Sequence, residues 1–279
     1  MQRIYWTVEN SHEITDQACA KVYTMLTFPD RKGKRVPDQG KSVSIIFTVL
    51  NEETNIGHLI NAIGKMNRSG NGWYLHRLIF ADGGSTDNTI RNIESAKSIL
   101  PDIEFIITAQ KVKPGTAPAT IEASLATDDD WIMVMDADLQ HPVHRIPAIL
   151  DVKAEGYNLV IASRNMEGGR ISRTFARGAV SRGAEILCRL RLKSSRGIRD
   201  PLSGFFVADA SLISGLVPRS GLYKLLLYIL ASTSDLKVKE VPYSFGKRIH
   251  GKSKLTSSST HFIRRYLKEL SYYRKIAKR

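Results

Sequence analysis

The chain has 279 residues, 42% of them hydrophobic, which suffices for one large α/β domain with or without appendages. Its two cysteines exclude a disulfide-stabilised scaffold and suit a reducing compartment. The formal net charge is +14, no apolar run approaches the roughly 18–20 residues of a transmembrane helix, and the N-terminal residues lack the apolar core of a signal peptide.

Residues 1–40 are polar and irregular, and we assign them no chemistry. After them, short apolar runs alternate with helix-like stretches as far as residue 163. The runs predict strands at residues 43–49, 75–80, 103–107, 131–135 and 159–163, and helical segments end near residues 66, 100, 126 and 155. Strands and helices that alternate through short loops predict a mostly parallel, doubly wound α/β sheet.

The alternation changes after residue 163. A long basic helix is predicted over about 174–192, a shorter helix over 223–231 and a strand over 238–245. The tail carries apolar residues at helical spacing, namely Phe262, Tyr266, Leu270, Tyr273 and Ile276. We therefore expect three segments: an extension (1–40), a main α/β domain (41–245), and a basic loop followed by an amphipathic membrane-surface helix (246–279).

Positive charge is concentrated in the second half of the chain. Residues 1–163 carry 16 Lys and Arg against 20 Asp and Glu, a net charge of −4, whereas residues 164–279 carry 25 against 7, a net charge of +18. Such an asymmetry indicates an anionic partner on one side: phosphate groups, an anionic membrane surface or nucleic acid. A solvated basic surface without a partner is the alternative.

The strongest local signal is Asp136-Ala137-Asp138, followed by Leu-Gln-His-Pro at 139–142. An apolar run, 131–135, predicts a buried strand, and two carboxylates separated by one residue follow directly at its end. Open α/β sheets bind ligands at the carboxyl ends of their strands, and alternate residues of an extended chain point the same way. Close anionic oxygens are natural ligands of Mg²⁺ or Mn²⁺ that carries phosphates. The sequence therefore predicts a metal–phosphate site, with two surface carboxylates as the alternative.

A second acidic turn, Asp-Gly-Gly-Ser-Thr-Asp at 82–87, follows the strand predicted at 75–80. Its glycines allow a ligand to approach the backbone closely. A carboxylate at a strand end suits ribose hydroxyls or base N–H groups, so Asp82 is a candidate nucleotide contact. A helix-capping role is a sufficient explanation for Thr86 and Asp87.

Several basic residues are candidate phosphate contacts, because arginine presents a planar fork that fits phosphate oxygens. Arg164 follows a strand end and is expected near the metal. The others are Arg177, and Arg248 and Lys254 in one Gly-flanked loop that could close over a ligand. The histidines match no zinc spacing, Ser203 has no Ser-His-Asp setting, and no phosphate-loop motif occurs.

Six motifs resemble, in order, those of the family 2 glycosyltransferases of GT-A fold, and within them the dolichyl-phosphate mannose synthases. They are Thr-Val-Leu-Asn-Glu at 48–52, Ala-Asp-Gly-Gly-Ser-Thr-Asp at 81–87, Asp-Ala-Asp-Leu-Gln-His-Pro at 136–142, Ser-Arg at 163–164, Asp-Pro-Leu-Ser-Gly-Phe at 200–205, and a loop with Phe-Gly-Lys-Arg at 245–248 and Gly-Lys-Ser-Lys at 251–254. The first two are generic to the family. The third, the Ser-Gly-Phe block and the loop are more specific to polyprenyl-phosphate glycosyltransferases.

The resemblance implies a GT-A catalytic domain and a role for each matching residue. A metal, Mg²⁺ or Mn²⁺, would be held by Asp136, Asp138 and Gln140. The nucleotide sugar would be bound by Val49, Asn51, Glu52, Asp82, Asp136, Asp138 and Arg164, and the acceptor phosphate by Arg164, Arg177, Ser203, Arg248 and Lys254. Asp138 and Arg248 would be catalytic. Three departures stand out: Gly83 replaces a frequent second Asp, Tyr228 replaces a frequent Glu, and the transmembrane helices of many relatives do not follow.

The activity implied is a metal-dependent, inverting transfer of a hexose, with mannose from GDP-mannose as the first expectation, to dolichyl or polyprenyl phosphate. The attacking phosphate oxygen is already anionic, so no strong general base is required. The basic tail is expected to bind an anionic membrane at its cytoplasmic face, and a tail helix packed on the protein core is the alternative. The sequence leaves open a separate membrane-anchoring subunit.

Two alternatives remain. One is a UDP-sugar-dependent family 2 transferase that adds glucose or GlcNAc to undecaprenyl phosphate or to a saccharide. The other is a basic nucleic-acid-binding protein. The second leaves the carboxylate pair unexplained and shows none of the usual motifs, so we expect no nucleic-acid partner.

Overall fold

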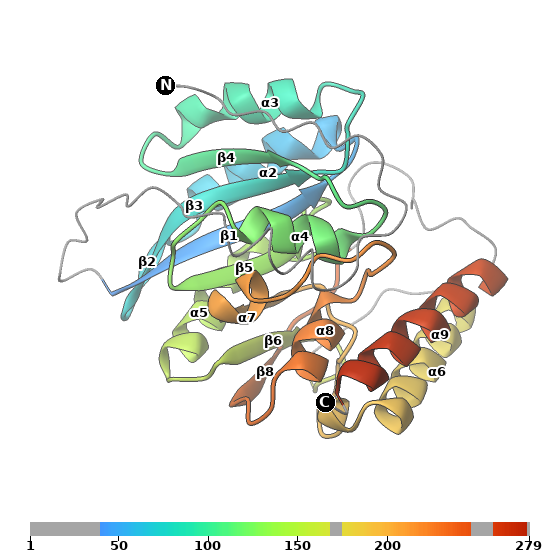
Figure 1. The fold of residues 1–279 in the computed structure, drawn as a ribbon. Helices are drawn as coiled ribbons and strands as arrows, with labels where there is room; N and C mark the ends of the chain where they lie inside the picture. The colour runs from blue at the N-terminus through green and yellow to red at the C-terminus, as the bar shows by residue number, and fades with distance from the viewer. Residues whose placement is uncertain (1–39, 168–174, 247–258, 278–279) are drawn as a thin grey trace. The chain divides into compact units, whose positions relative to one another are not determined.

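The computed structural model describes residues 40–167, 175–246 and 259–277, with the backbone alone for 175–181 and 259–262. These residues form one eight-stranded mixed sheet with helices packed on it (Figure 1). The predicted α/β class is confirmed. Residues 1–39 of the predicted N-terminal extension lie outside the described residues.

Most strands agree with the apolar runs. They are β1 (Lys41–Val49), β3 (Trp73–Asp82), β4 (Glu104–Ala109), β5 (Trp131–Asp136), β6 (Leu159–Ser163) and β8 (Val238–Pro242). Parallel pairing joins β4, β3, β1 and β5 in that order, and also joins β6 to β8. The short β2 (Ser69–Gly70) pairs antiparallel with β3. The sheet is therefore mostly parallel, as predicted.

One central strand was not predicted. β7 (Phe206–Asp209) lies between β5 and β6 and pairs antiparallel with both, so the main order is β3–β1–β5–β7–β6–β8. Its four residues continue directly from the Ser-Gly-Phe motif, and so short a run carries little periodicity. The sheet thus departs from a simple doubly wound arrangement at β7.

Helices cover both faces because the central strands are apolar on both sides. In β1, Val43, Ile45 and Phe47 join one core, whereas Ile46 joins the other. The first core is covered by α2 (Glu53–Lys65), α3 (Thr89–Ala96) and α5 (Ile146–Ala154). The second includes α4 (Thr116–Ser124), α6 (Phe175–Arg191), α7 (Ser211–Ser214), α8 (Leu225–Ser232) and α9 (Ser259–Ile276). Short 3-10 helices are η1 (Lys97–Ile99), η2 (Val143–Arg145) and η3 (Lys193–Ser195).

The tail helix is present as α9, but its apolar stripe faces the protein. Tyr266, Leu270 and Tyr273 are at most 5% exposed and pack in the second core. The Tyr266 hydroxyl donates to the Ala184 carbonyl of α6 at 2.8 Å, and the two helices run side by side in Figure 1. The stripe therefore secures α9 to the main domain, so a membrane contact would have to use another face of this helix.

Candidate functional site

The carboxyl ends of β3, β1 and β5 meet at one edge of the sheet. The parallel register pairs Val49 with Asp82 and Thr48 with Asp136, so both acidic turns leave the sheet beside the end of β1. Open α/β sheets bind ligands at such an edge. We call it the carboxyl edge; it comprises residues 49–52, 82–87, 136–141 and 163–164.

The turn after β1 is tied to the turn after β3. Asn51 adopts φ 52°, its N–H donates to Ser85 Oγ at 2.9 Å, and its side-chain oxygen accepts from the Thr86 N–H at 2.8 Å. The Glu52 N–H donates to Thr89 Oγ1 at 2.7 Å. Asparagine tolerates the left-handed conformation better than most residues. The predicted nucleotide residues of this turn thus form a braced unit, although their contact with a nucleotide stays a prediction.

Asp82 stabilises its own turn. Its carboxylate accepts from the N–H groups of Gly84 and Ser85, each at 3.0 Å, and from the Ser85 hydroxyl at 2.6 Å. Gly84 has φ 101°, a conformation that favours glycine. Lys113, in the loop before α4, donates to the Gly83 carbonyl at 2.7 Å. Asp82 therefore shapes the turn, and its contact with a nucleoside stays a prediction.

Of the two predicted capping residues, Asp87 caps the start of α3 and Thr86 does not, because the N–H and hydroxyl of Thr86 donate to Asn51. Its carboxylate accepts from the N–H of Thr89, the first residue of α3, at 3.0 Å and from that of Glu53 in α2 at 3.2 Å. Burial alone would raise the pKa of Asp87, but the hydrogen bonds from Thr89 and Glu53 lower it below its usual value.

At the end of β5 the two carboxylates differ in exposure. Asp136 is exposed, whereas Asp138 is 4% exposed and accepts from the Gln140 N–H at 3.1 Å. Gln140 donates its amide nitrogen to the Gly246 carbonyl at 3.3 Å, so its amide oxygen is the atom available as a ligand. Two carboxylates and an amide oxygen on one turn suit Mg²⁺ or Mn²⁺. Within the described ranges no three His, Cys, Asp or Glu side chains gather, so ligand oxygens would have to complete the coordination.

His141 is a packing residue. It is 2% exposed, its ring stacks on Phe205 with 5.1 Å between centroids, and Tyr243 and Phe245 approach it edge-on. Its Nδ1 accepts from the Asp136 N–H at 3.1 Å. Burial lowers the pKa of His141 to about 4, so the ring is neutral at pH 7. His141 therefore fixes the backbone at Asp136, in agreement with the sequence argument against a histidine base.

Arg164, just after β6, is held by a carboxylate that sequence reasoning missed. Its Nε and Nη2 donate to the two oxygens of Asp200, each at 2.7 Å, and Asp200 is fully buried at 0% exposure. Burial would lower the pKa of Arg164, but the hydrogen bond and charge of Asp200 raise it above its usual value. The guanidinium plane is therefore fixed beside the carboxyl edge. The signal for Asp200 was its place at the start of the Asp-Pro-Leu-Ser-Gly-Phe motif.

The other predicted phosphate contacts are less informative. Ser203 is 3% exposed, and its hydroxyl donates to the Ala162 carbonyl at 2.7 Å, which fixes the backbone beside β6. Arg177 lies on α6, but its side chain is outside the described residues, as are Arg248 and Lys254. The acceptor contacts of these four residues stay predictions.

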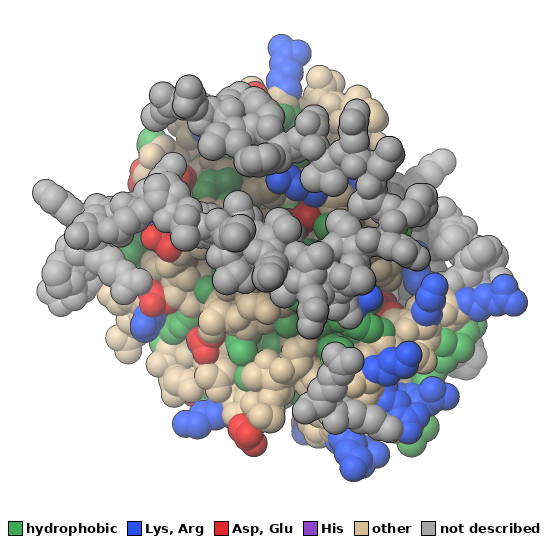
Figure 2. Space-filling view, in the orientation of Figure 1, with side chains coloured by type: hydrophobic (Ala, Val, Ile, Leu, Met, Phe, Trp, Pro, Cys, Tyr) green, Lys and Arg blue, Asp and Glu red, His purple; other side chains and the backbone are tan. Residues whose placement is uncertain are grey.

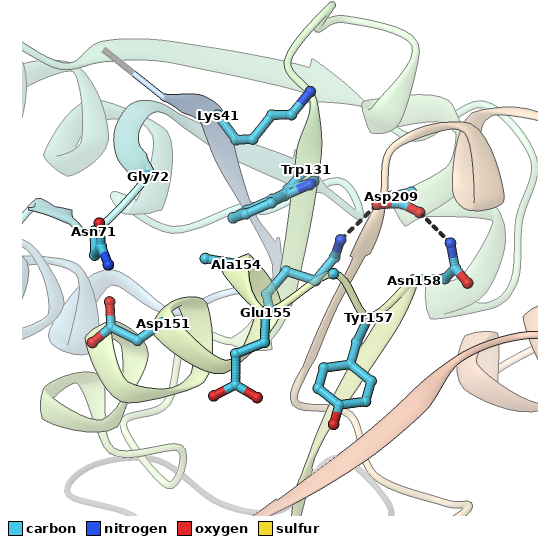
Figure 3. A pocket seen from close by; sticks show the side chains of 12 residues that line it. Lys41, Asn71, Gly72, Trp131, Asp151, Ala154, Glu155, Tyr157, Asn158 and Asp209 are labelled. Carbon is cyan, nitrogen blue, oxygen red and sulfur yellow. Dashed lines mark hydrogen bonds and ion pairs between the residues drawn. The ribbon is translucent and has the colours of Figure 1, made fainter. Parts of the chain in front are cut away.

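A cavity of about 690 Å³ lies at the opposite edge of the sheet (Figure 3). Its lining includes Trp131 and Asp209, and the Lys153 ammonium donates to Asp209 at 2.6 Å and lies 4.4 Å from the Trp131 ring centroid. Asn158 donates to the other oxygen of Asp209 at 3.0 Å. The lining contains none of the predicted site residues, so we place the candidate site at the carboxyl edge.

Known proteins resemble this chain in both sequence and fold. The model of glycosyl transferase family 2 matches residues 44–208. A dolichol-phosphate mannosyltransferase of Pyrococcus furiosus is 31% identical, over 82% of this chain and 63% of its own length. Another, of Saccharomyces cerevisiae, is 26% identical over 71% of this chain and 75% of its own length. The chain thus spans less than two thirds of the Pyrococcus relative.

Solved structures extend the likeness to the fold. Glucosyl-3-phosphoglycerate synthase from Mycobacterium tuberculosis, in complex with Mn²⁺, UDP and glucosyl-3-phosphoglycerate, has a TM-score of 0.61 at 22% identity and covers 86% of this chain and 81% of its own. The mixed sheet, the motifs at its carboxyl edge and a family match over more than half of the chain lead to one conclusion. This chain belongs to glycosyl transferase family 2 and has the GT-A fold.

Proposed function

We propose that this chain transfers a hexose from a nucleotide sugar to the phosphate of a polyprenyl lipid, with GDP-mannose as donor and dolichyl phosphate as acceptor. The observation that carries the proposal is the register that places Asp136 and Asp82 beside the end of β1. The relatives named dolichol-phosphate mannosyltransferase support this sugar and acceptor.

In this reaction an oxygen of the lipid phosphate attacks the anomeric carbon of the sugar. The bond from that carbon to the nucleoside diphosphate breaks, and the diphosphate leaves with the electron pair. Attack opposite the leaving group inverts the configuration. Because the attacking oxygen is already anionic, no side chain has to remove a proton, and neutral His141 is consistent with this.

Asp136, Asp138 and Gln140 would hold Mg²⁺ or Mn²⁺. Such an ion neutralises the charge that develops on the leaving diphosphate. Arg164, whose Nε and Nη2 are engaged by Asp200, would donate its remaining Nη1 to the same phosphates. The braced turn at 49–52 and Asp82 would line the nucleoside.

A basic surface on α6 and α9 suits the membrane in which the acceptor resides. Among the side chains that the structure describes on these helices, three large apolar ones are exposed: Ile186 at 56%, Leu190 at 68% and Ile263 at 46%. The same helices carry exposed basic residues, namely Arg182, Arg191, Arg264, Lys268, Arg274 and Lys275. Figure 2 shows Lys and Arg side chains gathered over this region, at the lower right. Apolar side chains among cations suit the headgroup region of an anionic membrane.

The membrane contact would be peripheral for the part of the chain that the structure describes. None of its helices is long and apolar enough to cross a bilayer. The cytoplasmic face and a separate anchoring subunit remain part of the proposal.

A UDP-sugar is the second candidate donor. The neighbouring Mycobacterium tuberculosis structures were solved with Mn²⁺ and UDP or UDP-glucose. Gly83, where many relatives carry an Asp, leaves the identity of the base open.

A donor panel tests the proposal. The chain is supplied with Mn²⁺ or Mg²⁺, a short polyprenyl phosphate and, in turn, GDP-mannose, UDP-glucose and UDP-GlcNAc. We expect lipid-linked sugar from GDP-mannose and a loss of product when the metal is chelated. Product from a UDP-sugar alone would overturn the proposed donor. No product at all, with salt-sensitive retention on DNA, would favour the nucleic-acid-binding alternative.

A further inference from the structure

A lysine that sequence reasoning did not single out lies beside the carboxyl edge. Lys224 immediately precedes α8 and is within electrostatic range of Glu269, Arg164, Asp136 and Asp200. Among the described residues its ammonium makes no hydrogen bond or ion pair. Burial lowers the pKa of Lys224, and it outweighs the carboxylates of Glu269, Asp136 and Asp200, which raise the pKa; Arg164 adds a smaller lowering effect. An anion bound next to this ammonium would compensate for the burial of its charge.

A single carboxylate oxygen fixes the backbone at Lys224. Glu269 of α9 is 4% exposed, and its Oε1 accepts from the N–H groups of Tyr223 at 2.7 Å and of Lys224 at 2.6 Å. The Tyr273 hydroxyl donates to the same oxygen at 2.6 Å and lies 3.1 Å from the Lys224 carbonyl. The start of α8 is therefore clamped to α9.

The segment that contains Lys224 is also hydrogen-bonded to the loop before α4, which contacts the turn after β3. Thr116 Oγ1 donates to the Tyr223 carbonyl at 3.1 Å, and the Gly221 N–H donates to the Pro114 carbonyl at 2.6 Å. The Ser220 hydroxyl donates to the carbonyl of Lys113, whose ammonium reaches Gly83. Residues 220–224 thus bridge α9 and the turn after β3, which fixes the backbone of Lys224 between them.

We infer that the Lys224 ammonium binds a phosphate oxygen of the reactants, and that Glu269 is the residue that positions it. The inference rests on the proposed function. The anion is either the diphosphate of the donor or the phosphate of the acceptor, which offer the same chemistry. An ammonium within electrostatic range of Asp136 and Arg164 can serve both, because it is a compact charge with three donors on a flexible stem.

The test compares Lys224→Met and Lys224→Arg with Lys237→Met, a control at an exposed lysine before β8. We expect Lys224→Met to lower kcat/KM at least about tenfold, the usual range for a charged hydrogen bond to a reactant. Lys224→Arg should recover part of this loss, because it keeps the charge, and Lys237→Met should behave as wild type. Thermal melting of each variant separates a loss of function from a loss of folding.

Two measurements distinguish the two sources of phosphate. Weaker binding of GDP and UDP in Mn²⁺, measured by calorimetry, would identify the donor diphosphate. Unchanged nucleotide binding with a raised KM for polyprenyl phosphate would identify the acceptor. The inference would be overturned if Lys224→Met folds and its kcat, its KM values for donor and acceptor, and its nucleotide affinity all equal those of the wild type.

The positioning role of Glu269 has its own test. If Glu269 acts through Lys224, the double variant Lys224→Met/Glu269→Gln should bind phosphate ligands no more weakly than Lys224→Met alone. If the two substitutions weaken phosphate-ligand binding by factors that multiply in the double variant, the residues act independently. That result would overturn the positioning role of Glu269.

Failure of the proposed function can be distinguished from failure of the inference about Lys224. If the wild-type chain transfers no sugar from any donor, the affinity for GDP, UDP and inorganic pyrophosphate still reports on Lys224. Wild-type binding that Lys224→Met weakens supports the inference without the activity. Absence of binding to all three by the wild type would overturn both.

Discussion

The two edges of the sheet carry charged side chains in different arrangements. We call the opposite edge, where β1, β3 and β5 begin, the amino edge. There charges pair directly: Lys153 with Asp209 at 2.6 Å in the cavity of Figure 3, Lys41 with Asp130 at 3.0 Å, and Arg77 with Asp129 at 2.8 Å. At the carboxyl edge Arg164 is paired with Asp200, but Asp136 is exposed and Lys224 has no direct counter-ion among the described residues.

This difference supports placing the proposed ligand site at the carboxyl edge. Direct pairing satisfies the charges of the amino edge within the protein, so a charged ligand would have to displace an existing partner. The carboxyl edge brings two carboxylates, a fixed arginine and Lys224 to one end of the sheet, where the proposed metal and phosphates would bind. Charge arrangement is therefore a better guide here than the volume of a cavity.

The largest expected effect is on catalysis at the carboxyl edge. Asp138→Asn should reduce transfer on the order of a thousandfold, because it removes a charge from the proposed metal and diphosphate site. Asp128→Asn is the matched control at the amino edge, where the carboxylate is 73% exposed, and it should remain active. Turnover of Asp138→Asn at the wild-type rate with Mg²⁺ or Mn²⁺ would refute the metal assignment.

The next effect compares the buried pair Arg164–Asp200 with the pair Lys153–Asp209, in which Asp209 is 32% exposed, by urea denaturation. Asp200→Asn should destabilise the fold by about 3 kcal/mol, because it leaves Arg164 buried without its partner. Asp209→Asn at the amino edge should reduce the free energy of unfolding by a smaller amount. Lys153 can lose its proton, and burial already lowers its pKa, whereas arginine cannot. Equal costs for the two variants would count against this explanation.

A smaller effect concerns the membrane surface. Ile186→Ser with Leu190→Ser should weaken binding to anionic liposomes by about tenfold, since both side chains are exposed on α6. Ile99→Ser is the control, because Ile99 is 50% exposed and lies in η1. Point variants are preferable to deletion of α9, which would uncover Tyr273 and Leu270. Unchanged co-sedimentation of the double variant would rule out this surface.

The smallest effect is expected at the amino edge. Lys153→Met removes the ammonium over Trp131 but should leave kcat and KM within about twofold of wild type, because this edge takes no part in the proposed reaction. A loss of transfer as large as that of Asp138→Asn would show that the comparison between the edges is wrong.

Several features of this protein could be predicted from the sequence. The apolar run that ends at Asp136 predicts both β5 and the position of the carboxylates, because strand length and strand end are local properties. The alternation up to residue 163 predicts parallel strands, and parallel strands place their carboxyl ends at one edge. The family and its GT-A fold followed from motifs at those ends.

Other features were decided by contacts between distant residues. Arg164 meets Asp200 across 36 positions, and Glu269 meets the Lys224 N–H across 45. β7 is a strand because β5 and β6 pair with it on both sides, which its four residues do not reveal. The stripe on α9 illustrates the limit most clearly. Its helical spacing determined that something apolar covers Tyr266 and Tyr273, and only the packing against the second core decided that the cover is protein rather than lipid.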